Sequence, residues 1–445
     1  MTYSEAIRFL YELQVFGVKL GLENVFRLAA LAGNPQNRLR FIHVAGTNGK
    51  GSTCAMLEGI YRAAGLRVGL FTSPHLVSFA ERIQVDRRPI AESEVARLVE
   101  QMRSLLQGGD FRRASPTFFE VVTVMALQYF AGQGCDLVIW ETGLGGRLDA
   151  TNIVTPLAGV ITNIQFDHQK WLGDTLAEIA REKAGIIKPD IPVITATADP
   201  AALEVIAQTA RARHAPLTVV TGRESEIRDY EIGLSGEHQR TNAALALAVA
   251  RMLRERIPVA DAAIRTGLKE VQWAGRLQRV GRAGGQTILL DGAHNPAGAQ
   301  SLAAALPGML PPGAADAGRR PALILGIMRD KDYAGICQIL APLAGRILLA
   351  PVGSARTADP ALLADCCRAA NPGAAVVPCE DLAAAFARAV GEEFIVVTGS
   401  IHFIGEAMEF LGLVPPSTER ALNDYYPSAV LPAVPHLKHC NSLSG

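Results

Sequence analysis

The chain has 445 residues, 49% of them hydrophobic, and its 43 basic residues balance its 43 acidic ones. A chain of this length can form two domains with sizeable cores, and a net charge of zero gives no indication of a nucleic-acid partner. Its seven cysteines form no CxxC pair and indicate neither a disulfide framework nor a zinc site. Glu5 and Arg8 interrupt the first apolar run, and no uncharged apolar run approaches the length of a membrane span. We therefore expect a cytoplasmic protein with no membrane partner.

The stretch FIHVAGTNGKGS, residues 41–52, predicts a strand, a glycine-rich turn and the start of a helix. This order is typical of phosphate-binding loops, because glycine lets backbone N–H groups approach the ligand and a lysine adds positive charge. Two positions depart from the usual motif: Val44 replaces the first glycine, and Gly51 separates Lys50 from Ser52. A plain glycine turn is the alternative. Lys50 and the hydroxyls of Ser52 and Thr53 favour nucleotide and Mg²⁺ chemistry.

Strands and helices alternate along the first part of the chain. Helices are predicted over 4–16, 22–32, 52–64, 92–106, 117–131, 175–184, 199–213 and 239–255, and strands over 41–44, 67–71, 136–140, 157–162, 192–195 and 217–220. Residues 41–71 are then a βαβ unit with parallel strands.

A change in composition near 273–286, where the chain is basic and rich in glycine, suggests an interdomain linker. A second α/β series follows, with strands predicted over 287–290, 322–327, 346–350 and 394–398. The predicted organisation is an N-terminal domain (1–274) with a mostly parallel sheet, a linker (275–285), a smaller α/β domain (286–413) and an irregular tail (414–445).

Polar residues follow several predicted strands, at the edge where open α/β sheets bind ligands. Ser73 follows strand 67–71, Glu141 follows 136–140, and Asp167 and His168 follow 157–162. A helix cap, a surface acid and a structural histidine are the alternatives, but acids and a histidine at successive strand ends favour a site. The Glu141 carboxylate is well placed to hold a metal beside the phosphate loop. Lys183, in the last turn of a predicted helix, is by itself typical of a lysine that interacts with the helix dipole.

Six stretches together resemble the folylpolyglutamate synthase/dihydrofolate synthase family, a branch of the Mur-type ATP-dependent amide ligases. They are HVAGTNGKGS (43–52), TSPHL (72–76), ETGLGGRLDATN (141–152), EKAGIIK (182–188), DGAHNP (291–296) and the TGS-plus-GE pattern at 398–406. Each is weak alone, but their joint order is specific and spans nearly all of residues 1–413. Phe118 is a mild departure, since family members often have a tyrosine in the stretch 115–120.

The resemblance implies an N-terminal P-loop ATPase domain, a Rossmann-like C-terminal domain and a reaction in the cleft between them. ATP would phosphorylate a carboxylate to an acyl phosphate, and the amine of L-glutamate would displace the phosphate to give an amide. The carboxylate would belong to dihydropteroate, or be the γ-carboxylate of a folate, and one bifunctional enzyme would use both. The other partners would be small molecules only, and the chain a monomer.

The resemblance also implies a set of site residues. The ATP phosphates would meet the loop Gly46, Thr47, Asn48, Gly49, Lys50, Gly51 and Ser52, and the rest of the nucleotide would meet Asn242, Arg276, Asp291 and His294. Two Mg²⁺ ions are implied: Ser73, Glu141 and the Ser52 hydroxyl would hold one, and His168 the second. Lys183 would carry a carbamate formed from CO₂, an anion able to ligate Mg²⁺. Thr117 and Phe119 would lie near the pterin.

Two other functions fit parts of the pattern. A cell-wall Mur ligase would share the ATP machinery but normally carries a separate N-terminal domain, and only about 40 residues precede the phosphate loop. A nucleotide-binding module without ligase activity is the other alternative. The joint presence of Lys50, Glu141, His168 and Lys183 counts against it.

Overall fold

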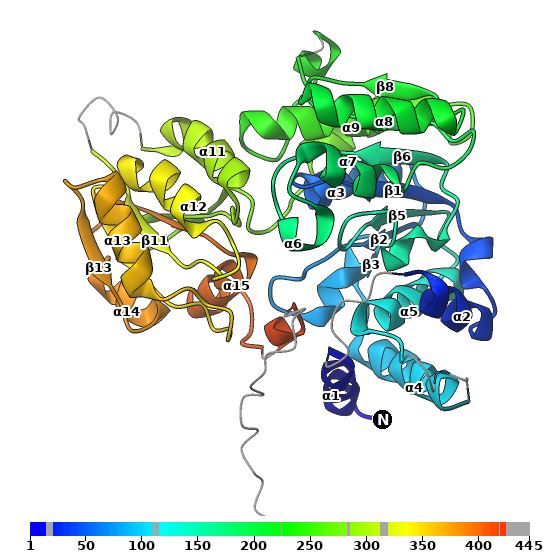
Figure 1. The fold of residues 1–445 in the computed structure, drawn as a ribbon, viewed down its shortest axis with the longest axis horizontal. Coiled ribbons are helices and arrows are strands. Elements are labelled where there is room, and N and C mark those ends of the chain that lie inside the picture. Colours follow the sequence, from blue (N-terminus) through cyan, green and yellow to red (C-terminus); the bar gives the residue numbers. More distant parts are fainter. Residues whose placement is uncertain are drawn as a thin grey trace, which may run out of the picture.

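A computed structural model describes residues 1–423 except 15–20, 109–110, 112–114, 224, 283–284, 312–318 and 418. The described chain forms two α/β domains that lie side by side, each built on a mostly parallel sheet (Figure 1). The end of the predicted first helix, much of the predicted loop over 311–320 and the tail from 424 lie outside the described residues.

The first domain is organised around an eight-stranded sheet. In spatial order its strands are β4 (Arg88–Pro89), β3 (Ile83–Val85), β2 (Val68–Phe71), β5 (Leu137–Glu141), β1 (Phe41–Ala45), β6 (Ala158–Ile161), β7 (Val193–Thr195) and β8 (Leu217–Val219). The strands from β2 to β8 in this order are parallel, and only β3 and β4 pair antiparallel. The carboxyl ends of β2, β5, β1 and β6 therefore meet side by side at one edge.

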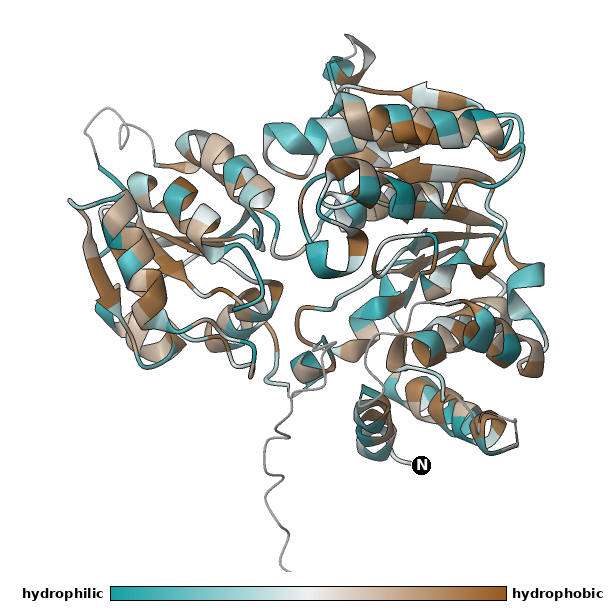
Figure 2. Ribbon diagram, in the orientation of Figure 1, coloured by the Kyte–Doolittle hydropathy of each residue, from teal (hydrophilic) through white to brown (hydrophobic). Residues whose placement is uncertain are grey.

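Helices cover both faces of this sheet, because its central strands are apolar on both sides. Phe41 of β1 belongs to one core with α1 (Tyr3–Leu13), α2 (Glu23–Leu31), α4 (Glu92–Gly108) and α5 (Phe118–Gly132). Its neighbour Ile42 belongs to the core on the other face, with α3 (Lys50–Ala63), α9 (Glu237–Met252) and α10 (Asp261–Lys269). A further core joins β6 and β7 to α6 (Gln169–Leu172), α7 (Leu176–Ala184) and α8 (Pro200–Ala212). Figure 2 shows the apolar strands between helices whose outward faces are hydrophilic.

The second domain is a six-stranded sheet between two helical layers. Its spatial order is β13 (Ala375–Pro378), β12 (Arg346–Leu349), β11 (Ala322–Leu325), β14 (Phe394–Thr398), β10 (Thr287–Leu290) and β9 (Gln278–Gly281), and only β9 is antiparallel to its neighbour. The core on one face includes α11 (Pro296–Ala305), α12 (Tyr333–Leu340) and α13 (Pro360–Ala370). The other includes α14 (Leu382–Arg388) and α15 (Ile401–Phe410).

Short 3₁₀ turns connect these elements. In the first domain they are η2 (Pro35–Arg38), η3 (Phe79–Arg82), η4 (Ala150–Ile153) and η5 (Ser225–Asp229), and in the second η7 (Leu306–Met309) and η8 (Ala341–Leu343). Among the described helices, none is both long and apolar enough to cross a membrane.

Three predictions differ from the structure. The predicted linker (275–285) contains β9, the edge strand of the second sheet, whose alternating exposure is hidden in the sequence by its basic and glycine residues. The predicted irregular tail begins with an ordered 3₁₀ turn, η9 (Glu419–Asn423), which contacts both domains. Helix α3 begins at Lys50 rather than at 52, because Gly49 before it adopts a left-handed conformation with a φ of 83°.

Candidate active site

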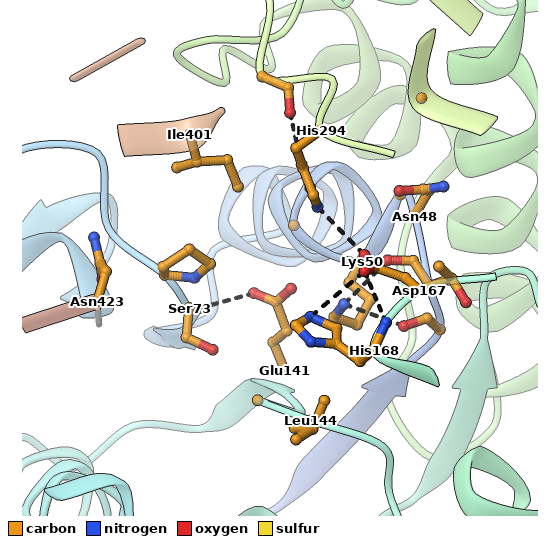
Figure 3. Close-up of a pocket in the computed structure, with 18 of the residues that line it drawn as sticks. Asn48, Lys50, Ser73, Glu141, Leu144, Asp167, His168, His294, Ile401 and Asn423 are labelled. Carbon is orange, nitrogen blue, oxygen red and sulfur yellow. Dashed lines mark hydrogen bonds and ion pairs between the residues drawn. The ribbon is translucent and has the colours of Figure 1, made fainter. Parts of the chain in front are cut away.

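Four neighbouring strand ends bring the predicted phosphate and metal residues together. Glu141 ends β5 and pairs with Val44 of β1, directly before the glycine-rich loop. On one side Ser73 follows β2, and its backbone N–H donates to Glu141 Oε2 at 3.1 Å. On the other side Asp167 follows β6. Figure 3 shows Ser73, Glu141 and Asp167 facing one another at the carboxyl edge of the sheet.

One cavity of about 300 Å³ lies between the two domains. The Thr53 hydroxyl is buried away from it. The other residues predicted for the site line it: Gly46, Thr47, Asn48, Gly49, Lys50, Gly51, Ser52, Ser73, Thr117, Phe119, Glu141, His168, Lys183, Asn242, Arg276, Asp291 and His294. The structure thus brings the predicted residues together, whereas the roles implied for them stay predictions.

The glycine-rich loop is held in a conformation that only glycine permits at two positions. Gly46 and Gly49 have φ values of 148° and 83°, and a Cβ atom would lie 1.8 Å from Thr162 Oγ1 and 2.4 Å from Asn242 Oδ1, respectively. The N–H of Asn48 donates to Asn163 Oδ1 at 2.8 Å, and Thr162 Oγ1 donates to the carbonyl of Asn48 at 2.6 Å. No side chain caps the start of α3. Its first backbone N–H groups are therefore available to an anion.

Lys50 bends back over this loop. Its Nζ donates to the carbonyls of Gly46 and Thr47 at 3.1 and 3.3 Å, and no described carboxylate forms an ion pair with it. The ammonium is thus held at the mouth of the loop by neutral groups. Its charge can be neutralised there by phosphate oxygens.

Glu141 is a carboxylate kept out of water. Its residue is 3% exposed, and burial raises its pKa to about 7, although the charge of Lys50 and the N–H of Ser73 act in the opposite direction. A bound cation would restore the ionised form. No cluster of three or more His, Cys, Asp or Glu that could hold a metal occurs in the described chain. A single carboxylate such as that of Glu141 suits Mg²⁺, which takes one or two carboxylates and completes its shell with phosphates and waters.

Asp167 connects the two domains across the cavity. Its carboxylate accepts hydrogen bonds from Lys331 Nζ at 2.6 Å and Asn295 Nδ2 at 3.1 Å, both from the second domain, and lies 3.5 Å from His294 Nε2. Burial opposes ionisation, but the neighbouring His168, His294 and Lys331 hold the pKa of Asp167 well below its usual value. Partial burial and the positive charge of Lys331 also lower the pKa of His168, which favours the neutral imidazole, the form that binds metals.

Lys183 is a buried amine beside the phosphate loop. The residue is 4% exposed, and its Nζ donates to the carbonyl of Gly46 at 2.9 Å. Burial, assisted by the charge of Lys50, lowers the pKa of this amine to about 7. A large fraction of Lys183 is therefore uncharged near neutral pH. Lys183 does lie in the last turn of α7, but a helix-dipole role alone does not account for its burial beside the phosphate loop.

Several predicted site residues also stabilise the local fold. The Asp291 carboxylate accepts from the N–H groups of Leu277 and Ala293, both at 3.0 Å, and shapes the turn after β10. Thr117 is the N-cap of α5, with its hydroxyl accepting from the N–H of Glu120 at 3.3 Å in a capping box.

No role was predicted from the sequence for Lys331 and Asn423 of the cavity wall, or for Asn295, which contacts cavity residues. Lys331 follows β11, so the rule that polar residues at strand ends form sites would have found it. Asn295 lies inside the DGAHNP motif and exchanges amide hydrogen bonds with Asn48, at 3.1 and 3.2 Å. Asn423 comes from the predicted tail, where no sequence signal points to the cavity.

The fold and the site define a Mur-type ligase. Residues 44–229 match the Mur ligase middle domain, and residues 275–401 match the glutamate ligase domain of Mur ligases.

Known relatives narrow this class. The dihydrofolate synthase/folylpolyglutamate synthase of Bacillus subtilis is 37% identical over 91% of this chain and 98% of its own length. The solved structure of Escherichia coli FolC in complex with DHPP and ADP has a TM-score of 0.80 and 32% identity, over 93% of this chain and 98% of that one. The structure of Mycobacterium tuberculosis folylpolyglutamate synthase complexed with ADP has a TM-score of 0.83 and 30% identity, over 93% of this chain and 100% of that one. The chain belongs to the folylpolyglutamate synthase/dihydrofolate synthase family, and it is an ATP-dependent amide ligase.

Proposed function

We propose that this ligase adds L-glutamate to dihydropteroate and to the γ-carboxylate of folates, with ATP converted to ADP and phosphate. The observation that carries the proposal is the convergence of Lys50, Glu141, Lys183 and Asp167 on one interdomain cavity with His294. A free carboxylate is a poor electrophile, so it must first gain a phosphoryl group that can leave. Positioning and charge neutralisation are the main tasks in such a transfer.

The phosphate loop binds the β- and γ-phosphates of ATP. The uncapped N–H groups at the start of α3 and the Lys50 ammonium face the transferring group, and they are already in place before the reaction. From the other wall, Arg276, Asp291 and His294 meet the rest of the nucleotide. Asn242, packed against Gly49, supports the loop from α9.

Two Mg²⁺ ions fit the donors of the cavity. Glu141, Ser73 and the Ser52 hydroxyl would hold one, and His168 with a modified Lys183 would hold the other. When bound, the ions neutralise phosphate charge. The raised pKa of Glu141 and the neutral imidazole of His168 support these roles, because a nearby cation would stabilise the ionised carboxylate and would be bound by the neutral imidazole.

Lys183 carries a carbamate in the active enzyme. Its uncharged amine attacks CO₂: a nitrogen–carbon bond forms, one C=O π bond breaks with its electron pair moving to oxygen, and the nitrogen loses one proton to solvent, which converts the side chain into an anion. The buried amine beside Gly46 supports this proposal, since burial favours the neutral nucleophile. Without the modification, the second ion would have few anionic protein ligands.

The acceptor carboxylate is placed between the phosphate loop and the wall that carries Thr117 and Phe119. Phe119 packs directly on Gly143, where an added Cβ would come within 2.6 Å of its ring, so the absence of a side chain at Gly143 lets this aromatic ring take its place in the wall. Because the described walls of the cavity come from both domains of one chain, a monomer is sufficient for the reaction.

The test is ADP release measured with dihydropteroate and with tetrahydrofolate, each with and without L-glutamate. The proposal predicts release that requires both glutamate and an acceptor, and activity with both acceptors. Release with a uridine-nucleotide cell-wall precursor instead would favour the other Mur-type ligase, and no release with any acceptor would favour the non-catalytic module.

A further inference from the structure

The 3₁₀ turn η9 (Glu419–Asn423) leaves the second domain and packs into the first. Just before it, the N–H of Ser417 donates to the Glu409 carboxylate of α15 at 2.7 Å, and Arg420 pairs with the same carboxylate. Leu422 is fully buried in the first domain's core. In Figure 1, η9 is the red turn between the domains. The turn is therefore fastened to both domains.

Hydrogen bonds join η9 to the loop between β2 and β3. The Glu419 carboxylate accepts from the N–H of Phe79 at 2.6 Å and from Ser78 Oγ at 3.1 Å. The carbonyl of Glu419 lies 2.9 Å from His75 Nε2. These bonds connect residues about 340 positions apart in the chain. They add to the loop's own hydrogen bonds, in which the Glu81 carboxylate accepts from the N–H groups of Leu76 and Val77.

Asn423 makes the contact closest to the cavity. Arg82 donates from a terminal nitrogen to Asn423 Oδ1 at 2.6 Å, and Asn423 Nδ2 donates to the carbonyl of His75 at 2.9 Å. The Arg82 guanidinium is fully buried, donates from Nε to His75 Nδ1 at 2.8 Å, and lies 5.4 Å from the ring centre of Phe118.

No described carboxylate forms an ion pair with Arg82, and one of its terminal nitrogens has no hydrogen-bond partner among the described residues. A buried charge is costly unless it is hydrogen-bonded. The Asn423 amide oxygen is therefore a main source of stabilisation for this guanidinium, and its loss would allow Arg82 and the loop to shift.

The loop that η9 holds also carries a predicted site residue. Ser73 lies two positions before His75 and donates to Glu141, and Asn423 lines the same cavity as Ser73, Thr117 and Phe118 (Figure 3). Asn423 is thus on the acceptor side of the cavity. The phosphate loop follows β1, not the β2 strand that leads into the loop held by η9.

We propose that Asn423 is a positioning residue for the acceptor: from the end of the second domain it fixes Arg82 and His75, and through them the wall against which the acceptor binds. This inference rests on the proposed function and adds to it a residue from a segment that the sequence marks as irregular.

Asn423→Ala tests the inference by steady-state kinetics of the full chain with dihydropteroate and ATP. Losing a hydrogen bond to a charged group should raise the KM for dihydropteroate about tenfold. The KM for ATP should rise much less, because the glycine-rich loop follows β1 and only Ser73 connects the loop held by η9 to the proposed metal site. Asn371→Ala is the matched control: this buried asparagine donates to the carbonyls of Ala341 and Ala344 in the second domain and does not line the cavity. It should lower stability and leave both KM values unchanged.

A second variant, Asn423→Asp, covers the case in which the alanine variant does not fold. It keeps the acceptor for Arg82 and loses only the donor to His75, so the KM for dihydropteroate should rise less than in Asn423→Ala. Parental KM values, or equal increases for ATP and acceptor, in either folded variant would overturn the inference. A parent chain without glutamate-dependent ADP release would instead overturn the proposed function, so the two failures are distinguishable.

Discussion

At the scale of single residues, the site depends on charges that are buried before any ligand arrives. Glu141 and Lys183 both lie at the phosphate loop, and burial shifts each pKa to about 7, upward for the acid and downward for the amine. Burial thus favours the protonated, neutral form of Glu141 and the deprotonated, neutral form of Lys183, each of which is the minor form in water at neutral pH. Perturbed groups that converge in one cavity are typical of catalytic sites.

Lys50→Ala should lower turnover by about a hundredfold or more, because it removes a preformed positive charge from the transferring phosphate. The fold should persist, since the hydrogen bonds of Lys50 Nζ to described residues go to two loop carbonyls. Lys188→Ala is the control: its Nζ also donates to a carbonyl, that of Asn152 at 3.0 Å, but it does not line the cavity. The measurement is kcat with circular dichroism of each variant. Near-normal turnover by folded Lys50→Ala would refute the role.

Lys183→Ala should abolish turnover, and acetate or formate should restore part of it by supplying the missing carboxylate near the second ion. The parent should lose activity in CO₂-depleted buffer and regain it with bicarbonate. Lys188→Ala should respond to none of these additions. A fully active parent without CO₂, together with a bare amine in a crystal structure with nucleotide and metal, would contradict the carbamate.

At the scale of elements, the start of α5 combines a helix cap with a wall of the cavity. Thr117 and Glu120 form the capping box, and the two residues between them, Phe118 and Phe119, line the cavity. The exact start of this helix therefore sets where two aromatic rings lie. Thr117 can therefore affect pterin binding indirectly, by fixing the start of this helix.

Thr117→Val should destabilise the protein by about 1 kcal/mol, because it removes the cap acceptor at nearly constant shape. It should also raise the KM for dihydropteroate. Thr175→Val is the matched control, since Thr175 and Glu178 form the same box at α7 but do not line the cavity. Equal losses of stability, with a KM change in Thr117→Val alone, are expected from thermal unfolding and kinetics. If the KM is unchanged in both, Thr117 is only a cap.

The alternating elements and the strand-end residues were predictable from sequence, because hydrophobic periodicity and parallel topology act over short stretches. The prediction failed where a strand is short and polar, as in β9, where Val280 lies between Arg279 and Gly281. It also failed where a side chain crosses between domains: Lys331 meets Asp167 over a separation of 164 residues, and Asn423 meets Arg82 over 341. Such contacts depend on how two cores dock, which no local pattern encodes.

At the scale of the whole molecule, the cavity exists because two domains face each other across it. The Asp167–Lys331 pair and the Asn48–Asn295 amides bridge the domains without any ligand, and η9 adds a further attachment. We expect these bridges to set the width of the cleft.

Lys331→Ala should open the ligand-free protein, because it leaves the buried Asp167 carboxylate without its closest cation. Small-angle scattering should show a larger radius of gyration than for the parent. A nonhydrolysable ATP analogue with dihydropteroate should reduce the difference. Arg319→Ala, which breaks an exposed pair with Glu393 inside the second domain, should leave the radius unchanged. Identical scattering for Lys331→Ala and the parent would argue that the other bridges fix the cleft.

The central claim is that the chain activates a carboxylate as an acyl phosphate before glutamate attacks it. The most direct measurement uses dihydropteroate labelled with oxygen-18 in its carboxylate, with ATP and L-glutamate, and follows the label by mass spectrometry. The account predicts one labelled oxygen in the released phosphate, the other in the amide carbonyl of the product, and no transfer with Lys50→Ala. Amide product without label in the phosphate, or phosphate release without amide product, would contradict it.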